Sequence, residues 1–283
     1  MKLTVTEIQS AVSAALAEDL GSGDATTLAT VPASAVSRAF MKAREPLVVA
    51  GIQFAELAFR ELSSTIRLKK CAADGQRLRA GDTILKISGS SRALLSAERV
   101  ALNFVQRLSG VATATAAFTQ IIKGTRVKIL DTRKTTPGWR RFEKYAVTAG
   151  GGKNHRMGLF DMILIKDNHL VALQNEKPNA IAAAISRARK QFPELAVEVE
   201  ADTLAQVAQA ADAGADIILL DNMTPAQLRA GVKIVQGRAK LEASGGVSLK
   251  TVRAIAAAGV DFISVGAITH SARAVDIGLD FAD

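Results

Sequence analysis

Charged residues stand at the ends of several apolar segments in the second half of this chain, and their types could bind and activate an anionic ligand. The segment DTRKTTPG (131–138) follows one apolar run and sets Asp131, Arg133 and Lys134 before a Pro-Gly turn. A charge at the end of a buried strand costs free energy unless a partner or solvent compensates it, so we expect these residues to face a ligand or one another. The charged residues at or near the ends of the later runs are Lys166, Asp167, Glu200, Asp221 and Glu242.

Cations outnumber carboxylates around these strand ends. His155 and Arg156 end the segment GGGKNHR (150–156), whose three glycines allow the backbone to turn sharply and approach a ligand closely. Arginine offers a planar fork to carboxylate or phosphate, and lysine a compact charge, so this set is suited to a strongly anionic ligand accompanied by a divalent metal ion. The residues expected together are Arg133, Lys134, His155, Arg156, Lys166, Glu200 and Asp221, with Arg107 and Lys153 near them.

Two later segments place small residues between an apolar run and a helical stretch. They are EASGGVSL (242–249) and GVDFISVGAITHS (259–271). Small residues that lead into helix N-termini can cradle a phosphate, and many α/β barrels build such a site from their last loops. The small residues concerned are Ser244, Gly245, Gly246, Gly266 and Ala267.

The elements that must position these residues follow a repeated pattern from residue 127 onward. Short apolar runs alternate with Ala-rich amphipathic stretches such as NAIAAAISRARKQF (179–192), which indicates buried parallel strands joined by helices. An α/β barrel and an ordinary doubly wound sheet would both place ligands at the carboxyl edge, and six runs do not establish eight-fold closure. No dinucleotide-binding or P-loop glycine motif is present. The runs are VKILDT (127–132), MILIKD (162–167), AVEVEA (196–201), DIILLDN (216–222), KLEASGG (240–246) and DFISVGA (261–267).

The first part of the chain reads as a mixed α+β region. A capping box of Thr6 and Gln9 predicts a first helix that Gly21 ends. Segments 35–51 and 66–87 have the alternation of strands. The stretch SAERVALNFVQRLSG (96–110) has helical periodicity, with Gly110 as its expected end and Arg107 on a polar stripe.

Composition excludes several classes of protein. The chain has 283 residues and a formal net charge of +9, but no block of like charges and only 4% aromatic residues, so we expect no nucleic-acid binding. Cys71 is the single cysteine, which excludes an intramolecular disulfide. The first residues carry acidic groups where a signal peptide has an apolar core, and no run is long and apolar enough to span a bilayer. We therefore expect a cytoplasmic protein that does not contact membranes.

Six segments closely resemble the quinolinate phosphoribosyltransferase family, and the resemblance covers nearly the whole chain. It implies a homodimer, with a hexamer also conceivable, in which a smaller N-terminal α+β domain (1–110, joined by 271–283) accompanies an open α/β barrel (111–270). The segments are EDLGSGDATT (18–27), ERVALNFVQRLSG (98–110), DTRKTTPGWRRFEKYAVTAGGGKNHRMGLFDMILIKDNH (131–169), VEVEADT (197–203), ILLDNM (218–223) and EASGGV (242–247).

The resemblance also implies an activity. The family transfers the phosphoribosyl group of phosphoribosyl pyrophosphate to quinolinate with loss of CO₂, giving nicotinate mononucleotide for NAD biosynthesis, and requires Mg²⁺. By this resemblance Lys134, Glu200 and Asp221 are catalytic, the two carboxylates face the ribose and its Mg²⁺, and Arg107 reaches the partner subunit's site. The full set of substrate-binding residues that it implies is Arg107, Thr132, Arg133, Lys134, His155, Arg156, Lys166, Glu200, Asp221, Ser244, Gly245, Gly246, Gly266, Ala267 and Ile268.

Two other functions are compatible with parts of the pattern. A Schiff-base aldolase would use Lys166 on its strand, but needs that lysine in an apolar pocket, and Asp167 follows it directly. A ligand-binding accessory protein, like relatives of the family associated with molybdate transport, would need no catalytic machinery. The intact TRKTTPG and NHR motifs favour the enzyme. For any one charged residue a surface position or an internal salt bridge is an adequate explanation, but the coincidence of all of them at strand ends is not explained in this way.

Overall fold

The structure is a computed structural model that describes residues 1–282, and the chain forms two compact units. Unit 1 contains Met1–Ala116, Thr136–Gly151 and Ile268–Asp283. Unit 2 contains Ala117–Thr135 and Gly152–Ala267. Over the described residues, no helix has both the length and the hydropathy that crossing a membrane requires.

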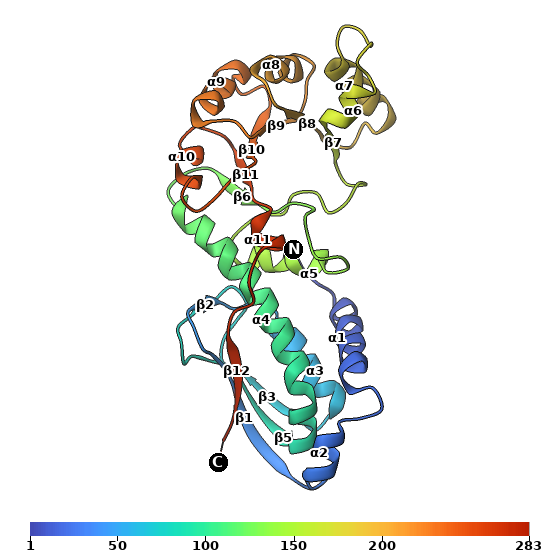
Figure 1. Cartoon of the computed structure of the whole chain (residues 1–283), viewed down its shortest axis with the longest axis vertical. Coiled ribbons are helices and arrows are strands. Elements are labelled where there is room, and N and C mark those ends of the chain that lie inside the picture. Colours follow the sequence, from blue (N-terminus) through green and yellow to red (C-terminus); the bar gives the residue numbers. More distant parts are fainter. Residues whose placement is uncertain (283) are drawn as a thin grey trace. The chain divides into compact units, whose positions relative to one another are not determined.

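Unit 2 is built on six parallel strands, and each of the six predicted apolar runs supplies one (Figure 1). Their order is β6-β11-β10-β9-β8-β7, so β6 and β7 stand at the two edges and the sheet forms an open barrel. The predicted α/β fold class is confirmed. The strands are β6 (Lys128–Leu130), β7 (Ile163–Ile165), β8 (Val197–Ala201), β9 (Ile217–Asp221), β10 (Lys240–Ser244) and β11 (Phe262–Ser264).

Helices follow most of these strands and pack their apolar sides inward. Asn179, Thr203 and Thr224 each accept a backbone N–H at a helix start, which fixes where three of the helices begin. In Figure 1, α8, α9 and α10 lie along the outer side of the strands. The helices are α6 (Asp167–Val171), α7 (Ala180–Gln191), α8 (Leu204–Asp212), α9 (Pro225–Val235) and α10 (Val252–Ala256).

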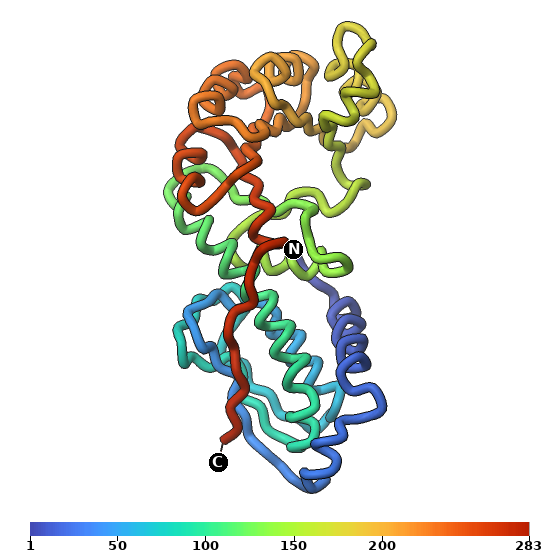
Figure 2. The backbone as a smooth tube through the Cα atoms, viewed as in Figure 1, coloured from blue at the N-terminus to red at the C-terminus, as the bar shows by residue number. Residues whose placement is uncertain are grey.

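Unit 1 contains an antiparallel sheet of order β12-β1-β5-β3 and a two-stranded ribbon of β2 and β4. The end of the chain returns to this sheet, because β12 pairs with β1, as the tube in Figure 2 shows. The strands are β1 (Val36–Ala43), β2 (Leu47–Val48), β3 (Arg67–Lys70), β4 (Arg77–Leu78), β5 (Thr83–Ser90) and β12 (Ile277–Phe281). The helices are α1 (Val5–Leu20), α2 (Ala25–Thr30), α3 (Ile52–Leu62), α5 (Arg140–Ala149) and α11 (Ala267–His270), together with α4 (Ser91–Ile121), whose last residues belong to unit 2.

The predicted helix boundaries need two corrections. The N-cap of α1 is Thr4 rather than Thr6, because Thr4 and Glu7 form the capping box, in which each side chain accepts the other residue's backbone N–H. Helix α4 does not end at Gly110 but continues to Ile121. A Cβ atom at Gly110 would lie 2.0 Å from the carbonyl oxygen of Arg273, so this glycine admits a close backbone contact inside the helix. The expected domain boundary at residue 110 therefore falls within a continuous helix.

Candidate active site

A cavity of about 430 Å³ opens at the carboxyl ends of the strands of unit 2. It brings together four strongly basic side chains and the two carboxylates that the sequence singled out, along with a third carboxylate. A concave site of this size and charge suits a small polyanion. The lining residues are Thr132, Arg133, Lys134, His155, Arg156, Leu164, Lys166, Glu200, Leu219, Asp221, Glu242, Ser244 and Ser264.

Strand alternation selects which residues reach the cavity. Successive side chains of a strand point to opposite faces, so residues two apart share a face. On β9 the lining residues are Leu219 and Asp221, and on β10 they are Glu242 and Ser244. The register pairs Glu242 with Leu219 and Ser244 with Asp221, so each strand gives the cavity one residue at its end and one residue deeper.

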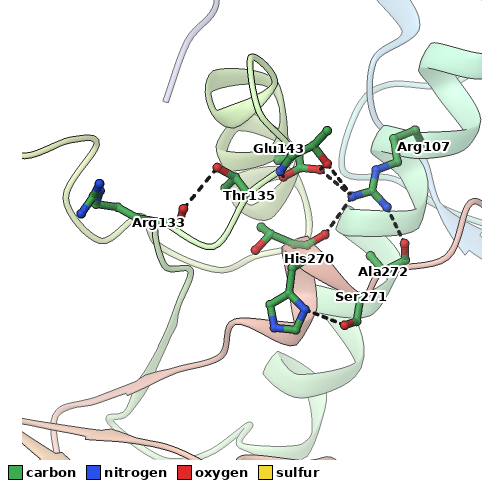
Figure 3. A network of polar contacts seen from close by, with 9 residues as sticks. Arg107, Arg133, Thr135, Glu143, His270, Ser271 and Ala272 are labelled. Atoms are coloured by element: carbon green, nitrogen blue, oxygen red, sulfur yellow. Dashed lines mark hydrogen bonds and ion pairs between the residues drawn. The ribbon is translucent and has the colours of Figure 1, made fainter.

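The loop that carries Arg133 and Lys134 is held by short-range contacts. The Lys134 backbone N–H donates to Thr132 Oγ1 at 3.0 Å, and the hydroxyl of Thr135 donates to the Arg133 carbonyl, as Figure 3 shows. These contacts bend the chain directly after β6 and keep Thr132, Arg133 and Lys134 at the cavity.

A segment added to the edge of the sheet positions His155 and Arg156. The Lys153 N–H donates to the Ile129 carbonyl at 2.8 Å, and the Asp131 N–H donates to the Lys153 carbonyl at 3.2 Å, so residues 153–155 run beside β6. The fully buried Asp131 carboxylate accepts from Asn154 Nδ2 and from the His155 N–H at 2.6 and 2.9 Å. Asp131 is therefore an anchor of this segment.

Two guanidinium groups lie close enough to affect each other. Burial, followed by the repulsion of Arg133, lowers the pKa of Arg156, while the nearby Glu198 and Asp161 act in the opposite direction. Arg156 Nη1 donates to the Met162 carbonyl at 3.1 Å, which holds the group in place. Two adjacent, partly desolvated cations repel each other until an anion binds between them, so this part of the cavity is suited to a carboxylate or phosphate.

Glu200 and Asp221 are the two carboxylates that the sequence placed at the rim of the cavity, and both line it. Lys166 Nζ forms an ion pair with Glu200, and Asn222 Nδ2 donates to Asp221 Oδ2 at 2.7 Å. Glu200 is the next-to-last residue of β8 and Asp221 is the last residue of the neighbouring β9, and both are half-buried. Mg²⁺ is typically held by one or two carboxylates together with substrate phosphates and water, so these two oxygen ligands fit that ion.

Most residues of the two small-residue loops do not line the cavity. Gly245 has φ +85°, and a Cβ there would lie 2.1 Å from Asn222 Oδ1, so no other residue fits between the ends of β9 and β10. Only Ser244 of this loop is a lining residue, and Gly246, Gly266 and Ala267 are not. Ile268 belongs to unit 1 and is fully buried.

The first glycine of the triplet before His155 allows close packing against a helix and does not approach a ligand. Gly150 belongs to unit 1, where a Cβ would lie 2.3 Å from the carbonyl oxygen of Ala112 on α4. Gly151 has φ +87° and turns the chain. The expectation that Gly150 approaches a ligand is therefore wrong, because a helix already occupies that space.

Arg107 lies in a network within unit 1 (Figure 3). Its guanidinium donates to Glu143 Oε1 at 2.5 Å, to the Thr269 carbonyl at 2.8 Å and to the Ala272 carbonyl. Glu143 is fully buried and also accepts from the backbone N–H and hydroxyl of Thr136 at 3.1 and 2.8 Å. The side chain of Arg107 is held rigidly and is 25% exposed.

A buried acidic cluster at the cavity floor was missed by the sequence prediction. His155 Nε2 lies 3.0 Å from Glu198 Oε2 and 3.6 Å from Glu242 Oε2, and both carboxylates are buried. Glu198 was not singled out at all, and Glu242 was left outside the predicted site. The signal was present in VEVEA, because Glu198 and Glu200 are two residues apart and so share a strand face. Ser264 is a further lining residue that was not predicted.

The cluster has the residue types of a metal site, since its ligand atoms lie within 4.8 Å of one another, but its hydrogen bonds oppose one. His155 Nδ1 accepts the backbone N–H of Arg156 at 2.7 Å. A neutral ring therefore carries its proton on Nε2, the nitrogen that faces the carboxylates. A protonated nitrogen has no free lone pair, so Nε2 cannot coordinate a metal ion. The same arrangement leaves both ring nitrogens of His155 with partners inside the protein.

Burial, followed by the repulsion of Glu198, raises the pKa of Glu242 to about 8. His155 acts in the opposite direction. A carboxyl group in this environment keeps its proton at neutral pH, unlike a carboxyl group at the surface.

Comparisons with known proteins identify the family of this chain. Family models described as the N-terminal and C-terminal domains of quinolinate phosphoribosyl transferase match residues 24–109 and 111–280. A Mycobacterium leprae protein named nicotinate-nucleotide pyrophosphorylase (carboxylating) is 45% identical over 272 residues, which are 94% of each chain. A Nicotiana glauca protein named quinolinate phosphoribosyltransferase (decarboxylating) 1 is 40% identical over 291 residues, covering 96% of this chain and 82% of that one. The crystal structure of NadC from Streptococcus pyogenes superposes with a TM-score of 0.94 over 100% of both chains, at 40% identity. Because these matches extend over nearly the whole sequence, the chain belongs to the quinolinate phosphoribosyltransferase family.

Proposed function

We propose that the cavity of unit 2 carries out the reaction of this family, in which quinolinate and phosphoribosyl pyrophosphate give nicotinate mononucleotide, CO₂ and pyrophosphate. The observation that supports this most directly is the gathering of Arg133, Lys134, Arg156 and Lys166 around one cavity that Glu200 and Asp221 also line. Quinolinate carries two carboxylates and phosphoribosyl pyrophosphate carries several phosphates, so both substrates need such a concentration of cations.

The arginines are suited to the planar acid. Arg133 and Arg156 repel each other across a partly buried space, and a carboxylate between them would relieve that repulsion. We therefore assign them to the quinolinate carboxylates. His155 lines the same wall, but because both its ring nitrogens already have partners, it would contribute ring surface there rather than an N–H donor.

The carboxylates are suited to the ribose. When the quinolinate nitrogen attacks ribose carbon 1, the bond from that carbon to pyrophosphate breaks and positive charge develops on the sugar. Glu200 and Asp221, at the ends of adjacent strands, would stabilise that charge, and Lys134 and Lys166 would stabilise the departing pyrophosphate. No protein nucleophile is required, and the site needs only to orient two reactants.

We also propose Mg²⁺ as the metal ion, with Glu200 and Asp221 holding it directly or through water. When bound with phosphoribosyl pyrophosphate, it would neutralise charge on the leaving group. Ser244 and the backbone of Gly245, Gly246 and residues 266–268 are proposed for the 5′-phosphate. Gly245, Gly246 and Gly266 lie between a strand and the following helix, where backbone N–H groups can favour an anion.

A Schiff-base aldolase has less support. Lys166 forms an ion pair with Glu200 and its side chain is 44% exposed, which is unlike the apolar pocket that such a lysine needs.

The direct test is a product assay on the purified protein. With quinolinate, phosphoribosyl pyrophosphate and Mg²⁺, we expect nicotinate mononucleotide, CO₂ and pyrophosphate in equal amounts, and nicotinate in place of quinolinate should give no product. Replacement of Arg133 or Arg156 by lysine keeps the charge but removes the planar fork, so kcat/KM for quinolinate should fall by about 10²-fold. Absence of all three products from the wild-type protein would refute the proposed function.

The family resemblance further leads us to propose a homodimer whose sites are shared, with Arg107 acting in the partner's cavity, in the cytoplasm. Arg107→Ala and Lys134→Ala proteins should each be inactive alone. Mixing them under conditions that exchange subunits should restore part of the activity. If exchange is demonstrated and activity does not return, Arg107 acts only within its own network.

A further inference from the structure

The floor of the cavity carries an acid that the proposed binding scheme does not use. Glu242 lines the cavity from β10, yet its side chain is only 1% exposed. Its neighbour Glu198 on β8 is fully buried. None of the four oxygens of these two carboxyl groups has a hydrogen bond of good geometry among the described residues, and the nearest donor is His155 Nε2, 3.0 Å from Glu198 Oε2.

This arrangement cannot hold two full negative charges at low cost. Unsolvated carboxylates without donors are strongly disfavoured in a protein interior, and two of them side by side are more so. The charged and polar groups that act on Glu242 are Glu198 on β8, His155 in the segment beside β6, Asp131 at the end of β6 and Ser264 on β11. Burial and the two carboxylates in this set disfavour a charge on Glu242, and His155 and the Ser264 hydroxyl act in the opposite direction.

The geometry also distinguishes the two groups. His155 Nε2 is 3.0 Å from Glu198 but 3.6 Å from Glu242, so Glu242 lies farther from the group that would offset a negative charge. Arg156 adds to this, because its electrostatic interaction is with Glu198. The burial of Glu242 and the charge of Glu198 raise the pKa of Glu242 to about 8, in agreement with the distances.

The overall reaction needs such a proton. Loss of CO₂ from ring carbon 2 leaves an electron pair on that carbon, and nicotinate mononucleotide has a hydrogen there. Among the described lining residues, Glu200 and Asp221 accept bonds from Lys166 and Asn222, and both nitrogens of His155 have partners. Glu242 is the lining carboxyl group that the surroundings keep protonated.

We propose that Glu242 is the general acid that protonates ring carbon 2 after decarboxylation. This inference rests on the proposed function of the cavity. The bond from carbon 2 to the carboxylate breaks, its electrons remain on carbon 2 beside the positively charged ring nitrogen, and CO₂ departs. The carbon then takes the proton from the Glu242 carboxyl group, which becomes a carboxylate and is reprotonated from solvent in the next cycle. Glu198 is a positioning residue that keeps Glu242 protonated.

The test separates pyrophosphate release from CO₂ release in single-turnover reactions of Glu242→Gln. The amide keeps the shape of the side chain but cannot give up a proton. We expect pyrophosphate to be released within a few-fold of the wild-type rate and CO₂ about 10²-fold more slowly, because an unprotonated carbanion recombines with CO₂. The mononucleotide that still carries both carboxyl groups should accumulate and be detected by mass spectrometry.

Two further variants separate catalysis from folding. Glu242→Asp retains an acid and should recover at least part of the CO₂ step relative to Glu242→Gln. Glu198→Gln removes the neighbouring charge and should move the alkaline fall of the CO₂ step to lower pH, without moving that of pyrophosphate release. Equal loss of both products in Glu242→Gln, with no recovery in Glu242→Asp, would overturn the assignment, as would wild-type rates for both steps. If the wild-type protein releases neither product, the proposed function itself fails.

Discussion

Glu143 in unit 1 and Glu242 in unit 2 are both removed from solvent, and their surroundings are opposite. Glu143 accepts bonds from the Arg107 guanidinium and from the N–H and hydroxyl of Thr136. Glu242 lies beside a second carboxyl group, and its oxygens have no hydrogen bond of good geometry among the described residues. A buried carboxylate whose bonds are complete ties elements together, whereas one whose bonds are missing has a raised pKa and is available for chemistry.

The largest expected effect is a lower free energy of unfolding when Glu143 is replaced. Glu143→Gln leaves the Arg107 charge without its counter-ion, and breaking a buried pair in this way costs about 3 kcal/mol. The single tryptophan, Trp139, stacks on Phe104 within unit 1, so its fluorescence in a urea titration reports on this unit. The exposed Glu61 is a matched control in unit 1, and Glu61→Gln should leave the curve unchanged. A loss below about 1 kcal/mol at Glu143 would mean that the pair is compensated elsewhere.

The glutamate-to-glutamine substitution at Glu242 should raise the free energy of unfolding at alkaline pH, whereas at Glu143 it should lower it. The pKa of Glu242 is about 8 in the folded protein against 4.5 when unperturbed, so the folded state retains a proton that the unfolded state releases. Its contribution to stability is complete below pH 4.5 and is lost as pH rises towards 8. Glu242→Gln removes this dependence and should be more stable than wild type above pH 8 by about 1 kcal/mol.

Hydrogen exchange of β8 and β10 measures this effect in unit 2, where tryptophan fluorescence does not report. Glu194→Gln, at an exposed position before β8, provides the control. If hydrogen-exchange protection changes with pH in the same way in wild type and in Glu242→Gln, the pKa of Glu242 is not raised in the folded protein.

The smallest effect is expected at Glu45, a partly exposed counterpart of Glu143 in unit 1. The side chain of Arg273 and then the N–H of Asp276 lower the pKa of Glu45 from 4.5 to about 2. Its stabilisation is present above pH 4.5 and is lost as pH falls towards 2. Glu45→Gln should cost at most about 1 kcal/mol at pH 7, with the difference shrinking as a urea titration is repeated at lower pH. A difference that does not depend on pH would show that the contact acts through packing.

Much of unit 2 could be predicted because parallel strands have a strong local signature. Each of the six apolar runs is a strand, and Lys166, Glu200 and Asp221 at or just beyond the strand ends do line one cavity. The carboxyl ends of parallel strands lie at the same edge, so position along the run is enough to bring such residues together.

The prediction failed where a residue's environment depends on distant segments. Gly110 has the type of a helix end, but the chain near Arg273 packs against it and the helix continues. Glu198 and Glu242 are ordinary charged residues in their own strands, and only the curvature of the sheet and the segment of His155 bring them into contact.

The sequence by itself determined the parallel strands, the charged rim and the family, because these depend on local periodicity and on ordered motifs. The tertiary structure decided what each charge does. It gave hydrogen-bond donors to the carboxylates of Glu143 and Asp131, and it buried Glu198 and Glu242 near each other without hydrogen bonds of good geometry to the residues that the structure describes. The physical reason is that the ionisation of a carboxyl group is set by burial and by neighbours a few ångströms away, and in this protein those neighbours come from other strands.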